Sequence, residues 1–81
     1  MSDYENIVIS AVRYALGRCT YIVNLTVNYV IKDIENKKLS NKCLCVILSD
    51  IEHTKNLGMD CDIKDWTMLK NKIMEVINES I

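Results

Sequence analysis

Residues that end helices occur at only a few places in this chain. None of the 81 residues is proline, and the two glycines are Gly17 and Gly58. Glycine readily takes the left-handed conformation that ends many helices, whereas a proline inside a helix breaks it. We therefore expect helices to end near these glycines, and residues 35–38 to form a polar connector.

Apolar side chains at helical spacing predict a first helix over residues 3–16, with Ser2 or Asp3 as its N-cap. Its expected buried face consists of Tyr4, Ile7, Val8, Ala11, Val12 and Ala15. A second segment runs from Thr20, the expected cap, to about Glu35. Its apolar stripe consists of Val23, Val27, Val30, Ile31 and Ile34.

Two further helices are indicated in the second half of the chain. Ser40 is a cap for the third, and Leu39 is placed to pack on Leu44 as a hydrophobic staple. This helix is expected to end at residues 56–58, and its stripe consists of Leu44, Ile47, Leu48 and Ile51. A fourth helix follows, with the cap at Asp60 or Asp62 and the stripe Trp66, Leu69, Ile73, Val76 and Ile77.

Two segments also carry a strand signal. Residues 21–31 alternate apolar and polar side chains in a β-branched stretch, and residues 43–48 form a short apolar run that such a strand would pair with. The capping signals and the absence of a hairpin turn favour helices. We predict an all-α fold, a compact bundle of about four short helices in a single domain over residues 1–81. The alternative is an α+β fold with strands at 21–31 and 43–48.

Composition and charge restrict the class of protein. With 49% hydrophobic residues the chain is that of a folded domain, and its small size favours a homo-oligomer. The net charge of −1 does not favour a protein that coats nucleic acid. The N-terminus is acidic where a signal peptide is basic, and no apolar run approaches the ~18 residues of a membrane span. We expect a soluble cytoplasmic protein with no membrane segment.

The cysteines, the single histidine and the motifs of the chain indicate neither a metal site nor an enzyme. Cys43 and Cys45 would point about 200° apart on a helix, so they are badly placed to share a zinc ion. His53 is the only histidine, and no nucleophile is placed near it by sequence. There is no Gly-rich phosphate loop, no pair of catalytic carboxylates and no Ser-His-Asp grouping. We expect no catalytic residue, no metal and no cofactor.

One short stretch combines groups that bind anions. Arg13 and Arg18 flank a helix end at Gly17, and Thr20 opens the next helix. Guanidinium groups, a hydroxyl and a helix N-terminus are the usual components of phosphate sites. Tyr14 and Tyr21 could stack on a base or on an arginine. The stretch is therefore a candidate ligand site. The alternative is a structural corner, in which Arg18 pairs with a surface acid and the tyrosines fill the corner.

The run over residues 9–23 resembles a segment of short proteins from bacteriophages and prophages with the pattern R-Y-A-L-G-R-x-[ST]-Y. The similarity extends to residues 62–66. The resembling proteins commonly carry arginine at position 19, where this chain has Cys19.

The resemblance implies a phage protein, acting in the cytoplasm of the infected bacterium, that inhibits a host antiviral defence. With the arginines, it suggests a protein that sequesters an anionic nucleotide signal. The alternatives are a protein-binding inhibitor of a CRISPR effector and an accessory protein with weak nucleic-acid binding.

Overall fold

The computed structural model describes residues 1–54 and 60–79. This part of the chain forms four helices: α1 (Asp3–Ala15), α2 (Thr20–Glu35), α3 (Asn41–His53) and α4 (Asp60–Glu79). The predicted all-α bundle is confirmed. Residues 21–31 lie in α2 and residues 43–48 in α3, so the α+β alternative is wrong.

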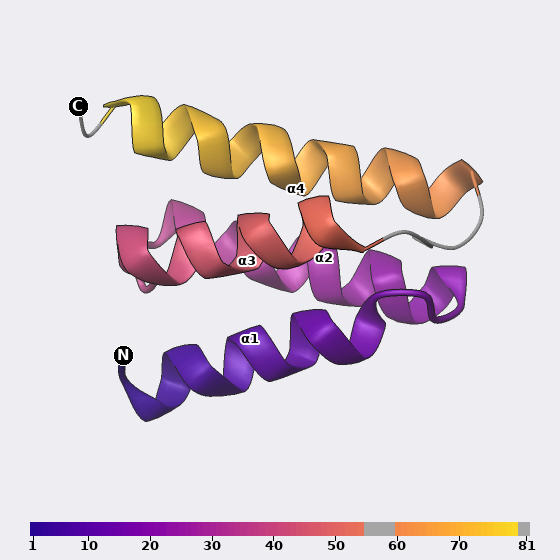
Figure 1. Ribbon diagram of the computed structural model, residues 1–81, viewed down its shortest axis with the longest axis horizontal. Helices are drawn as coiled ribbons and strands as arrows, with labels where there is room; N and C mark the ends of the chain where they lie inside the picture. The colour runs from indigo at the N-terminus through magenta and orange to yellow at the C-terminus, as the bar shows by residue number, and fades with distance from the viewer. Residues whose placement is uncertain (55–59, 80–81) are drawn as a thin grey trace.

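The helices are arranged in three layers (Figure 1). α2 and α3 form the middle layer, with α1 on one side and α4 on the other, and both outer helices pack on both middle ones. None of the described helices is both long enough and apolar enough to span a membrane. Because α1 packs only on the middle layer, a large part of its surface remains open to solvent.

The core consists of the apolar stripes of the four helices. Its fully buried members include the stripe positions predicted on each helix: Val12, Ala15, Val23, Val27, Leu44, Ile47, Trp66, Leu69 and Ile73. Ile31, Leu48, Val76 and Ile77 are only partly buried at its margin. At about 25 cal/mol for each Å² of apolar surface buried, this core is the main favourable contribution to folding.

The buried face of α1 differs from the predicted one. Val8, Ile9, Val12 and Ala15 face the core, whereas Tyr4, Ile7 and Ala11 are exposed. The apolar arc of α1 is wider than the contact with the middle layer, so one edge of it is left uncovered. Placing Tyr4, Ile7 and Ala11 in the core was therefore wrong.

Two of the three described helix starts follow the predicted caps. Ser2 caps α1 through a capping box with Glu5, and the Ser40 hydroxyl accepts a bond from the Cys43 N–H at 3.3 Å. Thr20 is not the cap of α2. Cys19 has the extended backbone of an N-cap and makes no side-chain capping bond, whereas Thr20 is already helical. The predicted cap at Asp60 or Asp62 falls outside the described side chains. The predicted end of the third helix at residues 56–58 is wrong, because α3 ends at His53 and its C-cap Thr54 already has an extended backbone, with φ −84° and ψ 119°.

A buried carboxylate joins the starts of α1 and α3. Glu5 Oε1 accepts bonds from the Ser2 N–H and hydroxyl, each 3.1 Å long, and Oε2 accepts bonds from the Ser40 N–H at 2.8 Å and hydroxyl at 2.6 Å. The bonds from Ser40, followed by the one from the Ser2 N–H, lower the pKa of Glu5 from 4.5 to about 2. The charged form of Glu5 therefore holds the two helix starts together.

Candidate anion-binding site

A tight turn connects α1 to α2 and positions the second arginine. Leu16 has φ −60° and ψ 120°, Gly17 has φ 80°, and the Arg18 N–H donates to the Ala15 carbonyl at 3.0 Å. These values define a type II turn, whose third residue needs a positive φ that glycine takes without strain. The predicted helix stop at Gly17 is confirmed. The turn carries Arg18 back toward the last turn of α1.

Arg18 lies on a tyrosine ring. Its guanidinium carbon is 4.6 Å from the centre of the Tyr14 ring, and its Nε donates to the Tyr14 carbonyl at 3.1 Å. This is a cation–π contact, worth about 0.5–1 kcal/mol at an exposed site. It orders the Arg18 side chain on one face of Tyr14.

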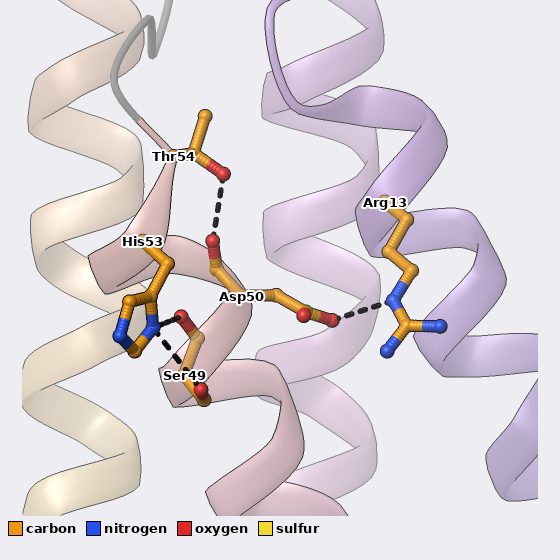
Figure 2. A network of polar contacts seen from close by, with 5 residues as sticks. All are labelled: Arg13, Ser49, Asp50, His53 and Thr54. Atoms are coloured by element: carbon orange, nitrogen blue, oxygen red, sulfur yellow. Dashed lines mark hydrogen bonds and ion pairs between the residues drawn. The ribbon is translucent and has the colours of Figure 1, made fainter.

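Arg13 points toward α3 (Figure 2). Its Nε donates to Asp50 Oδ2 at 2.8 Å, and the Arg13 side chain is 60% exposed while that of Asp50 is 23% exposed. Of the Arg13 nitrogens, only Nε takes part in this bond. The two terminal nitrogens form no hydrogen bond with any of the described residues. The ion pair therefore orients the guanidinium group without using most of its donors.

The space beside Arg13 is a hollow between the end of α1 and the end of α3. It has a volume of about 430 Å³ and is lined by Arg13, Leu16, Asp50, His53 and Thr54.

The polar groups of the hollow are held by bonds within α3. The Thr54 hydroxyl donates to the Asp50 carbonyl at 2.6 Å, and His53 Nδ1 lies 2.8 Å from the Ser49 carbonyl (Figure 2). A carbonyl can only accept, so Nδ1 carries a proton. The side chains around the hollow are therefore ordered before any ligand enters.

The sequence-predicted residues are gathered at one corner of the bundle, where the two arginines have different partners among the described residues. Arg13 pairs with Asp50 and Arg18 with Tyr14. Tyr14 and Tyr21 are 58% and 73% exposed, and Thr20 is half-buried in the first turn of α2. Both tyrosines are thus largely exposed, and among the described residues the acid Asp50 pairs with Arg13 and not with Arg18.

Three polar residues of this hollow were not predicted. Asp50, His53 and Thr54 come from the end of α3, and Asp50 lies 37 positions from Arg13. Asp50 and His53 are three residues apart, which places them on adjoining sides of a helix, but nothing in the sequence shows which helix they face.

The described residues contain no group of three His, Cys, Asp or Glu side chains that could hold a metal ion. Cys43 is buried and Cys45 is exposed, on different sides of α3. Burial, with a smaller effect of the Glu5 charge, raises the pKa of the Cys43 thiol to about 11. The Cys43 thiol is therefore a poor nucleophile and a poor metal ligand near neutral pH.

Known proteins give no further guide to the use of this corner. Comparisons with protein-family models, with curated proteins and with solved structures find no match to this chain.

Proposed function

We propose that this chain is a non-enzymatic binding protein that holds a phosphate-bearing nucleotide at the corner formed by Arg13 and Arg18. One observation carries the proposal. Among the described residues, each arginine forms its hydrogen bond through Nε and not through its terminal nitrogens, Arg13 to Asp50 and Arg18 to the Tyr14 carbonyl. The terminal nitrogens of both side chains, which bond none of the described residues, remain to meet an anion. An ordered guanidinium group loses little entropy on binding, and it can bond phosphate with two parallel donors.

The ion pair with Asp50 does not prevent anion binding at Arg13. Asp50 takes only the Nε of Arg13, and an exposed ion pair of this kind contributes about 0–1 kcal/mol. A phosphate dianion can therefore bind the terminal nitrogens while Asp50 keeps the Nε. The Asp50 carboxylate also repels an anion in the same hollow, so it both orients Arg13 and lowers its affinity.

A nucleotide fits the corner better than inorganic phosphate does. Tyr21 is 73% exposed, which leaves its ring open for a base. Tyr14 already carries Arg18 on one face. Together with the resemblance to phage proteins, this supports a protein that sequesters a nucleotide signal of a host antiviral defence.

The proposal is tested by isothermal titration of the purified chain with cyclic dinucleotides, linear nucleotides and inorganic phosphate. We expect Arg13→Gln to weaken binding about 10- to 100-fold, because one charge-assisted contact is lost. We expect Asp50→Asn to strengthen binding, because it removes the repelling carboxylate while an amide oxygen still accepts from Nε.

Lys32→Gln is the matched control, since Lys32 is an exposed cation at the far end of α2. We expect it to leave the affinity unchanged. Absence of binding across the whole panel, or equal binding by wild type and Arg13→Gln, would show that the corner does not recognise nucleotides.

A further inference from the structure

An apolar surface spreads over the sides of α1 and α2 that face away from the core. Six large side chains form it, and we name this set the α1–α2 face: Tyr4, Ile7, Tyr14, Tyr21, Leu25 and Tyr29. They are between 36% and 73% exposed. All four tyrosines of the chain belong to it.

The spacing of these residues is that of a helix-packing surface. On α1, Tyr4, Ile7, Ala11 and Tyr14 follow one another at intervals of three, four and three residues. This is the spacing at which helices form a seam with a neighbouring helix. On α2, Tyr21, Leu25 and Tyr29 recur every four residues and form a second row.

A groove of about 360 Å³ lies between the two rows. Its floor and walls are almost entirely apolar, and none of the described residues that line it is charged. The small side chain of Ala11 lines this groove and leaves room for a side chain from outside. Depletion of charge and enrichment in tyrosine are typical of the centre of a protein interface.

The α1–α2 face is also ordered at one end. The Tyr4 hydroxyl donates to Asp33 Oδ2 at 2.5 Å and lies 3.3 Å from the Tyr29 hydroxyl. Asp33 itself is buried, and its bond raises the pKa of Tyr4 above its ordinary value. Two tyrosine rings are thus held in place before a partner arrives, which reduces the entropy that binding would cost.

We propose that the α1–α2 face is covered by the same face of a second copy of this chain, in a symmetric homodimer. With about 200 Å² for each large side chain, the exposed parts of the six residues amount to roughly 700 Å². A standard stable interface buries ~800 Å² on each partner. A symmetric dimer needs a surface that is complementary to itself. Here a row of side chains on one copy can pack into the groove of the other copy, and the reverse contact follows by symmetry.

This dimer does not depend on nucleotide binding at the arginine corner. Tyr14 and Tyr21 belong to both features, so a dimer that covers their rings and a base stacked on Tyr21 compete with each other. Ile7 and Leu25 belong only to the α1–α2 face. Substitutions at Ile7 and Leu25 therefore test the dimer without removing an arginine or its contacts.

The experiment is sedimentation equilibrium of the full chain over a range of concentrations, without added nucleotide. We expect a dimer for the wild type. We expect Ile7→Asp and, separately, Leu25→Asp to raise the dimer Kd by ~100-fold or more, because each variant buries two charges in a symmetric interface. Ile63→Asp is the matched control, since Ile63 is an exposed isoleucine on α4, and it should leave the dimer Kd unchanged.

Circular dichroism of each variant measures whether the monomer is still helical. We expect that it is, because Ile7 and Leu25 are exposed. A wild type that is monomeric at all concentrations overturns the proposal and leaves the α1–α2 face for a different protein. A dimer that persists in both Ile7→Asp and Leu25→Asp also overturns it, because another surface would then form the interface.

Discussion

Glu5 shows how a single charged residue can serve two helices. It accepts four bonds from Ser2 and Ser40, and it is 8% exposed. Its negative charge also lies at two helix N-termini, where the helix dipole favours an anion. The carboxylate is thus needed in its charged form, and protonation must weaken the contact between α1 and α3.

This gives the stability of the protein a defined dependence on pH. The pKa of Glu5 is about 2 in the folded chain, compared with 4.5 for an ordinary glutamate. Its contribution is therefore complete above pH 4.5 and is lost as the pH falls toward 2. We expect Glu5→Gln to lower the midpoint of urea unfolding at pH 7 and to flatten the loss of stability over that acid range.

Glu75→Gln is the control for this experiment, because Glu75 is an exposed glutamate on α4. We expect its unfolding curves to follow those of the wild type at each pH. Equal acid sensitivity of Glu5→Gln and the wild type would show that other carboxylates cause the loss.

At the scale of the elements, α2 has the weakest of the three helix starts that the structure describes. Cys19 takes the extended N-cap conformation, with φ −68° and ψ 157°, but its side chain makes no capping bond. Serine in this conformation accepts a bond from a first-turn N–H, which stabilises a helix by about 1 kcal/mol. We expect Cys19→Ser to raise the free energy of unfolding by about this amount, measured by urea denaturation.

The matched control is Cys45→Ser. Cys45 is also exposed, but it lies inside α3, where serine has no N–H to cap. We expect no gain in stability from it. An equal gain in both variants would trace the effect to the loss of a thiol rather than to the cap.

The helices could be predicted from the sequence because each has a regular apolar stripe. The strand signal in residues 21–31 has a physical cause that the structure reveals. Leu25 and Tyr29 are exposed apolar residues, so α2 is apolar on two sides and its helical period is obscured. The same cause explains why Tyr4 and Ile7 were assigned to the core. A sequence pattern distinguishes apolar from polar positions, but it does not tell which apolar side faces the core.

At the scale of the whole molecule, packing decides which residues meet at the corner. Arg13, Tyr14 and Arg18 were predictable as a group because one helix end and one turn contain them. Asp50 and His53 were not, because the pairing of α1 with the end of α3 depends on how the layers assemble. The same assembly leaves the α1–α2 face uncovered and the arginine corner open beside it.

The most direct measurement follows the two arginine side chains themselves. Arg13 and Arg18 are the only arginines of the chain, so a ¹H–¹⁵N correlation spectrum contains one Nε–H signal for each. We predict that a bound nucleotide shifts the Arg13 signal in a saturable manner. We also predict that in Arg13→Gln, which lacks the Arg13 signal, the Arg18 signal shifts only at nucleotide concentrations about 10- to 100-fold higher than in the wild type. Arginine signals that stay unchanged up to millimolar nucleotide would contradict the proposed function.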